Sequence, residues 1–163
     1  MSKQGALEDE SGFTLVELTI VIILMGTVMA IASSMWFGAV ESRRVDSATN
    51  QLAADLRQAH TKAINRLADQ TVTLTATQSE YTLPGGVAED LDDNGSTGLA
   101  GDAVYVTAAT TIVFKGDGSA QVTGAGLTAA NPITVRGTTP PANGGRKHTI
   151  VINPVTSAVQ IGP

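Results

Sequence analysis

One carboxylate, Glu17, lies near the start of an otherwise apolar stretch, and its charge needs an explanation. Residues 13–37 contain no other ionisable side chain. A carboxylate at the centre of a membrane helix costs about 2.5–3.5 kcal/mol, and less near an interface. A free α-amino group at Phe13 would supply a positive partner, from the same chain or from a neighbouring copy. That amine forms only if the peptide bond between Gly12 and Phe13 is cut.

The apolar stretch is long enough to be a membrane-spanning helix. Residues 18–40 carry no charge, and about 20 helical residues span the roughly 30 Å of hydrocarbon in a bilayer. A secretory signal has a shorter apolar region, of about 7–15 residues, with a small-residue cleavage site behind it. We therefore expect residues 13–37 to form a transmembrane helix. Glu17 then either lies passively at headgroup depth or pairs with an amine inside the membrane.

The sequence GFTLVE at residues 12–17, followed by the apolar stretch, resembles the class III cleavage and methylation motif of type IV prepilins and type II secretion pseudopilins. The resemblance implies that residues 1–12 are a leader peptide. It also implies that a prepilin peptidase cuts between Gly12 and Phe13 and methylates the new Phe13 amine. Glu17 would then pair with the Phe13 amine of a neighbouring subunit while a filament assembles.

The same resemblance implies where the protein works. It predicts an inner-membrane protein with a single span, its C-terminal domain outside the cytoplasm, which an inner-membrane assembly platform transfers into a filament. The leader departs from the family pattern, because acidic residues 8–10 lie where basic residues are usual. Arg43 and Arg44 follow the span, so the positive-inside rule alone does not favour this orientation.

The helical pattern continues beyond the apolar stretch and becomes one-sided. Residues 39–70 contain no Pro or Gly. Apolar residues recur at spacings of three, four or seven, with charged residues mostly on the other faces, which indicates an amphipathic helix. We predict one helix from about residue 13 to about residue 68, with His60 packed near its apolar stripe. The stripe comprises Val45, Leu52, Leu56, Ala59, Ala63 and Leu67.

After residue 69, apolar and polar residues alternate, which predicts short strands. Tight turns at 115–119 and 153–157 favour antiparallel pairing, and the amphipathic half of the helix can cover one face of the sheet. The predicted fold class is α+β and pilin-like, with domains at 1–12, 13–37 and 38–163. The predicted strands are 71–77, 103–107, 111–115, 119–123, 133–137, 148–153 and 158–161.

Two segments of the strand region carry a second resemblance. IVFKGDGSA (112–120) and RKHTIVINPVTSAVQI (146–161) are similar to the GspH/FimT family, the H-type minor pseudopilins of type II secretion and their minor-pilin relatives. This resemblance implies a structural subunit of a type II secretion pseudopilus or a type IV pilus, assembled with other pilin or pseudopilin subunits. The alternative is a filament-tip or membrane-tethered binding module that captures DNA or secreted cargo.

One acidic segment has the pattern of half a calcium loop. Asp90, Asp92 and Asn94 place oxygen side chains at alternate positions, as calcium ligands in such loops are placed. The twelfth position is Gly101 in place of the expected Glu, with Asp102 one residue later. Two interpretations stay open, namely a solvated acidic turn or a calcium site made of Asp90, Asp92, Asn94 and Asp102.

Basic residues are too few to favour nucleic acid as the main partner. Residues 38–163 contain 9 Lys and Arg against 11 Asp and Glu, whereas binding to phosphates needs a basic face. Arg146 and Lys147, near Arg136 and His148, form the only basic cluster late in the chain; we expect a charged turn, with DNA binding as the alternative. The chain has no cysteine and no nucleophile, phosphate-loop or metal-cluster motif, so we expect neither an enzyme nor a required cofactor.

Overall fold

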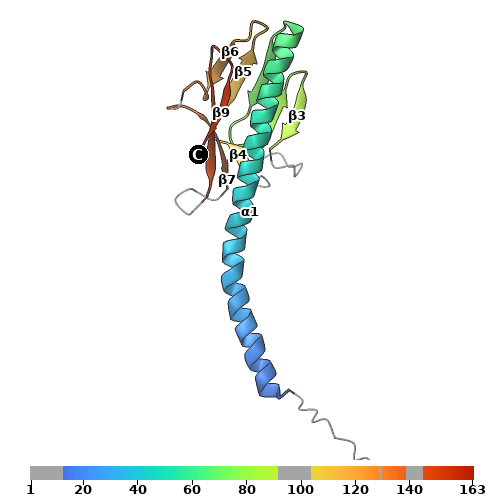
Figure 1. Ribbon diagram of the computed structural model, residues 1–163, viewed down its shortest axis with the longest axis vertical. Helices are drawn as coiled ribbons and strands as arrows, with labels where there is room; N and C mark the ends of the chain where they lie inside the picture. Colours follow the sequence, from blue (N-terminus) through green and yellow to red (C-terminus); the bar gives the residue numbers. More distant parts are fainter. Residues whose placement is uncertain (1–12, 92–103, 129, 139–144) are drawn as a thin grey trace, which may run out of the picture. The chain divides into compact units, whose positions relative to one another are not determined.

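A computed structural model describes residues 13–91, 104–128, 130–138 and 145–163, with the backbone alone for 33–38. The chain divides into two compact units, Met1–Phe37 and Gly38–Pro163. Helix α1 (Leu15–Arg66) contributes residues to both units (Figure 1). The prediction of one helix from about residue 13 to about residue 68 is confirmed to within two residues at each end.

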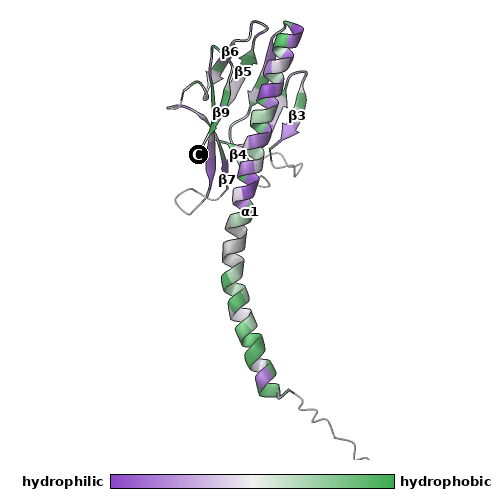
Figure 2. Ribbon diagram, in the orientation of Figure 1, coloured by the Kyte–Doolittle hydropathy of each residue, from purple (hydrophilic) through white to green (hydrophobic). Residues whose placement is uncertain are grey.

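The N-terminal part of α1 is the apolar segment, Leu15–Ala32, which has a mean hydropathy of 2.5 (Figure 2). It is long and apolar enough to cross a membrane, judged by length and composition. Its two threonines hold their polar atoms within the helix, because the Thr19 hydroxyl donates to the Leu15 carbonyl at 2.5 Å and the Thr27 hydroxyl donates to the Leu24 carbonyl at 2.8 Å. Such bonds reduce the cost of a hydroxyl in an apolar surrounding.

At each end of α1, a hydrogen bond satisfies a backbone group that has no partner within the regular helix. At the start, the Glu17 N–H donates to Thr14 Oγ1 at 3.2 Å, the N-cap bond expected from a Thr-x-x-Glu sequence. At the end, the Ala68 N–H donates to the Ala63 carbonyl at 3.2 Å. Leu67, the first residue after the helix, has φ 49°. This is a left-handed conformation that glycine usually adopts at this position.

The Gly38–Pro163 unit holds two antiparallel sheets, where the sequence predicted one. The order in the first sheet is β3-β2-β1-β5-β6, and the order in the second is β4-β7-β8-β9. Strand β5 pairs with β1 and β6, whereas β4 pairs with β7 and forms an edge of the second sheet. The α+β class is confirmed. The first sheet contains β1 (Gln70–Leu74), β2 (Glu80–Leu83), β3 (Val87–Asp90), β5 (Thr110–Phe114) and β6 (Ala120–Gly124); the second contains β4 (Val104–Val106), β7 (Ile133–Gly137), β8 (Lys147–Ile152) and β9 (Val159–Gly162).

The sequence analysis did not predict the β2–β3 hairpin, and it extended the first strand three residues beyond its observed end. Strand β1 ends at Leu74, and Thr77 has φ 62°, which ends the extended run. The β2–β3 turn contains Gly85 and Gly86, with φ values of 99° and 80° that a residue with a Cβ rarely adopts. Strands β4 to β9 otherwise match their predicted ranges within one residue, and both predicted turns are present.

The core of this unit lies between α1 and the inward faces of the two sheets. Figure 1 shows α1 running between β3 and β9. The His60 ring lies 5.7 Å from the Phe114 ring, as its place near the apolar stripe predicted. Leu67 is the one residue of the predicted apolar stripe that is not buried, because it follows the last helical residue and is 82% exposed. The buried residues of α1 are Val45, Ala48, Thr49, Leu52, Ala53, Leu56, Ala59 and Ala63.

Candidate functional site

The apolar segment presents large side chains on every face of the helix. They are exposed in this unit, with Phe13 just before the first turn. An apolar surface of this extent needs lipid or other apolar helices as its surrounding. Glu17 lies in the first turn, where the positive end of the helix dipole favours a carboxylate. Gly12, the other residue of the predicted cleavage site, lies outside the described residues.

The predicted calcium loop is described only at its first residue. Asp90 is the last residue of strand β3 and not part of a loop, and its carbonyl accepts a hydrogen bond from Gln51 Nε2 at 3.5 Å. Asp92, Asn94 and Asp102 lie outside the described residues. Within the described ranges, no group of three or more His, Asp or Glu side chains could hold a metal ion. Calcium binding stays a prediction.

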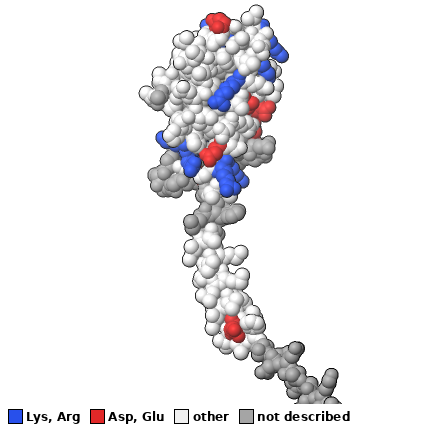
Figure 3. Space-filling model, in the orientation of Figure 1, with Lys and Arg blue, Asp and Glu red and all other residues white. Residues whose placement is uncertain are grey.

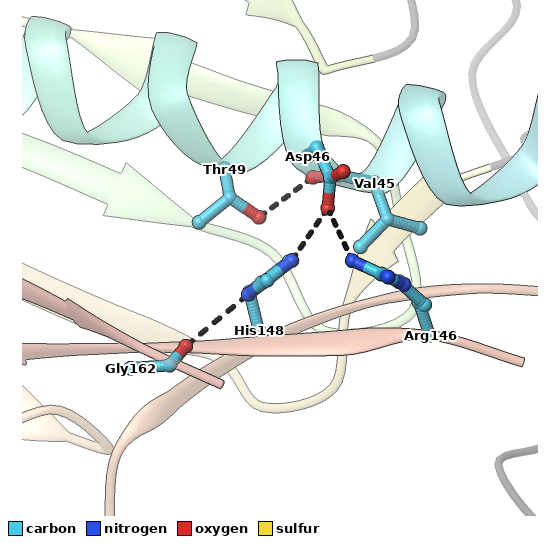
Figure 4. Close-up of polar contacts among 6 residues, drawn as sticks. All are labelled: Val45, Asp46, Thr49, Arg146, His148 and Gly162. Atoms are coloured by element: carbon cyan, nitrogen blue, oxygen red, sulfur yellow. Dashed lines mark hydrogen bonds and ion pairs between the residues drawn. The ribbon is translucent and has the colours of Figure 1, made fainter.

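A polar cluster joins α1 to the second sheet (Figure 4). Asp46 Oδ1 lies 2.6 Å from His148 Nε2 and 3.5 Å from Arg146 Nη1. His148 Nδ1 lies 3.2 Å from the Gly162 carbonyl oxygen. A carboxylate and a carbonyl can only accept, so a neutral imidazole could donate to one of them and only an imidazolium could donate to both. His148 therefore links the helix, β8 and β9.

Beside this cluster the surface is hollowed into a cavity of about 260 Å³. Thr49 Oγ1 donates to the Val45 carbonyl at 2.7 Å and so has its bond within the helix (Figure 4). Polar side chains of α1 form one wall, and β8 and β9 form the other. The lining residues are Asp46, Thr49, Asn50, Arg146, His148 and Ile161.

The predicted basic cluster is divided between different surroundings. Asp46 forms an ion pair with Arg146 and reduces its positive charge, whereas Lys147 is exposed at the start of β8. Arg136, opposite Lys147 in the β7–β8 register, lies with its guanidinium carbon 5.6 Å from the Tyr105 ring centre. Figure 3 shows basic and acidic side chains interspersed over the visible face of this unit. The positive potential offered to a phosphate is thus smaller than the spacing in sequence suggested.

A second polar contact between α1 and a sheet involves Tyr81 and Asp55. The Tyr81 hydroxyl donates to Asp55 Oδ2, although the tyrosine side chain is almost fully buried. Burial raises the pKa of the Tyr81 hydroxyl far above its usual range, and the hydrogen bond to Asp55 raises it further. Since both effects favour the neutral phenol, this contact is structural.

Sequence reasoning missed the cluster and its acid, Asp46. Asp46 was one of several charged residues on the polar faces of the helix, and no spacing rule connects it to His148. The capping role of Thr14 had a signal, because Thr14 and Glu17 have the spacing of a capping box.

Two family models match the chain. The prokaryotic N-terminal methylation motif matches residues 9–33, and the type II transport protein GspH matches residues 48–156. No curated protein and no solved structure matches it significantly. The first match covers the apolar segment with its single acid, and the second covers α1 from Ala48 and most of both sheets. The GspH match spans more than half of the chain, and the chain therefore belongs to the GspH family of type II transport proteins.

Proposed function

We propose that this chain is a minor structural subunit of a type II secretion pseudopilus or a type IV pilus. The observation that carries the proposal is the order of the two family matches, a methylation motif at 9–33 followed by the GspH region at 48–156. The exposed apolar segment supports it, because helices of this kind bury their surface against one another when they leave lipid. Members of this family are structural subunits, so the function proposed is assembly and not catalysis.

Processing creates the charge that assembly uses. A prepilin peptidase cuts between Gly12 and Phe13 and methylates the new Phe13 amine, which stays cationic. Thr14 caps the helix through the Glu17 N–H, so the first turn is already formed at the new terminus. The Glu17 carboxylate then pairs with the Phe13 amine of a neighbouring subunit. In a surrounding of low dielectric this attraction is several-fold stronger than in water.

Before assembly the subunit waits in the inner membrane with its Gly38–Pro163 unit outside the cytoplasm. The single apolar segment supplies the anchor. The assembly platform in that membrane then moves the subunit into the filament. There the partners of residues 13–37 are the same segments of other pilin or pseudopilin subunits.

Substitution of Glu17 tests the proposal. We expect Glu17→Val to insert in the membrane and to lose its leader, since neither step needs the carboxylate, but to be absent from purified filaments. Glu17→Asp is the matched control that keeps the charge, and it should assemble in part. Mass spectrometry of the mature N-terminus should find methylated Phe13 in both. Normal assembly of Glu17→Val, or an uncut N-terminus in native filaments, would refute the proposal.

A further inference from the structure

One end of the Gly38–Pro163 unit brings together the first turns of its helix, the end of β7 and the start of β8. Arg136 and Lys147 are register partners, so β7 ends where β8 begins. The Glu41 side chain of α1 packs against Gly137, where a Cβ would collide with it. Helix α1 enters the unit here, so the same helix leads from this end into the apolar segment.

This end of the unit is basic, although the unit as a whole is acidic. Residues 38–163 contain 9 Lys and Arg against 11 Asp and Glu, yet more than half of these bases lie here. In the described part of the chain, the acids at this end are Glu41 and Asp46, and Asp46 is paired with Arg146 (Figure 4). The bases without a carboxylate partner among the described residues are Arg43, Arg44, Arg136 and Lys147.

Two of these bases face each other across neighbouring strands. Arg136 and Lys147 are directly opposite in the β7–β8 register, so their side chains share one face of the sheet, where like charges are destabilising. On β4, the register partner of Arg136 is Tyr105, whose ring centre lies 5.6 Å from the guanidinium carbon. An aromatic ring attracts a cation but does not neutralise it. The row therefore offers both positive charges to an external anion.

The place of this end in the chain favours a lipid head group as the anion. Trp36 and Phe37 lie near the end of the uncharged stretch, and aromatic residues are typical of the interface between membrane and water. Arg43 and Arg44 are the first charges after Glu41. Basic residues next to a membrane span attract anionic lipids. DNA, the other common polyanion, needs a basic face, and the rest of this unit is acidic.

We propose that this end of the Gly38–Pro163 unit, the basic end, binds the head groups of anionic lipids in the membrane that anchors α1. Arg136 and Lys147 contact lipid phosphates from the sheet, and Arg43 and Arg44 contact them from the helix. The inference rests on the proposed function for the membrane anchor. Bound phosphates reduce the repulsion between Arg136 and Lys147, and the docked unit keeps one orientation while the subunit waits in the membrane.

The test measures how close the basic end comes to lipid head groups. The chain has no cysteine, so Thr138→Cys provides a single exposed thiol for a fluorescent dye beside Gly137. Val155→Cys, exposed in the turn beyond the other end of β8, is the matched control. The full chain is placed in nanodiscs that contain a head-group nitroxide quencher. The discs are made from phosphatidylcholine alone or from an equimolar mixture with phosphatidylglycerol.

We expect the dye at position 138 to be quenched more strongly in the anionic discs than in the zwitterionic ones. High salt should reduce this difference, because it screens exposed charges. The dye at position 155 should be quenched equally in both kinds of disc.

Charge variants separate the named residues from a general attraction. Arg136→Gln combined with Lys147→Gln should lower the ratio of docked to free units in anionic discs by about tenfold or more. Lys62→Gln combined with Lys115→Gln removes the same charge elsewhere in the unit and should dock like the parent chain. Lys147→Glu turns the like-charge pair into an opposite pair, so it should raise the melting temperature and still weaken docking. A merely structural role of Lys147 would not affect docking.

Equal quenching of the dye at position 138 in both kinds of disc would overturn the proposal, and so would a double variant at Arg136 and Lys147 that docks like the parent. The proposal also fails if the chain binds a double-stranded DNA oligonucleotide through these two residues and shows no dependence on anionic lipid. Leader cleavage and filament assembly do not depend on any of these results, so the proposed function would stand. Its own failure would appear as an uncut N-terminus in native filaments.

Discussion

Asp46 of α1 and His148 of β8 are separated by 102 positions in the chain, yet Asp46 Oδ1 and His148 Nε2 lie 2.6 Å apart. The other ring nitrogen of His148 faces the Gly162 carbonyl at 3.2 Å. One side chain thus contacts the helix and the last strand of the second sheet at the same time. Both residues of this contact also line the cavity beside it.

Asp46→Asn should lower the free energy of unfolding by about 1–2 kcal/mol, which is less than a buried hydrogen bond with a charged group contributes, because the Asp46 side chain is 42% exposed. Arg146→Ala removes the longer contact of the same carboxylate, between side chains that are 55% and 42% exposed, and should cost less than about 1 kcal/mol. Urea unfolding of the full chain in detergent measures both. Equal losses for Arg146→Ala and Asp46→Asn would show that the ion pair, and not the histidine, holds α1 to β8.

Tyr81→Phe should lower stability at neutral pH and change its dependence on alkaline pH. The lost bond to Asp55 costs about 1.5–3 kcal/mol, because the acceptor is ionised. Burial raises the pKa of Tyr81 in the folded state, above the value of about 10 in an unfolded chain. The stability that the neutral phenol contributes is therefore complete below about pH 10 and is lost as the pH rises further.

The parent chain should lose more stability than Tyr81→Phe between about pH 9 and about pH 11, the interval around the unfolded tyrosine pKa. Unfolding in urea across that interval provides the comparison. Two parallel stability curves would mean that Tyr81 does not hold its proton more tightly in the folded state.

Periodicity was sufficient for α1 and for most strands, because their burial follows local sequence. Leu52, Leu56 and Ala63 are buried on one face of the helix, as their spacing predicted. The β2–β3 hairpin was not predicted, because each of its strands has only four residues and mixes apolar and polar side chains. Gly85 and Gly86 form its turn, but a pair of glycines indicates a hairpin only when the strands on both sides are recognised.

The candidate site divides in the same way. Glu17 could be singled out from sequence, since a single acid in an apolar run is a local feature. The pairing of Asp46 with His148 and the cavity beside it depend on which strands become neighbours, and the strand order was not predicted. No sequence pattern indicates which of two residues far apart in the chain will be in contact, because only the fold brings them together.

Leu67→Gly should stabilise the protein by about 0.5–1 kcal/mol. Leu67 has φ 49° and is 82% exposed, so its side chain contributes little packing. A left-handed conformation costs a residue with a Cβ about 1–2 kcal/mol, and the greater freedom of glycine in the unfolded chain offsets part of that gain. Leu67→Ala keeps the Cβ and is the matched control; thermal unfolding should give it no increase. If the melting temperature rose equally for both variants, the gain in stability would come from the loss of the leucine side chain and not from relief of the left-handed backbone.

Gly116→Ala should destabilise the protein, because the β5–β6 turn packs directly against the end of α1. A Cβ at Gly116 would lie 2.6 Å from the Leu67 carbonyl carbon and 2.9 Å from the Ala68 nitrogen, and backbone atoms cannot rotate away as a flexible side chain can. Overpacking of this kind costs about 1–3 kcal/mol.

Val155→Ala in the β8–β9 turn is the control, since its side chain is exposed and its loss should change stability by no more than about 0.5 kcal/mol. Chemical denaturation compares the two variants. The effect of Gly116→Ala should shrink when Leu67→Gly is added, because a glycine at 67 lets the end of the helix move. Strict additivity of the two changes would show that the turn and the helix end are not coupled.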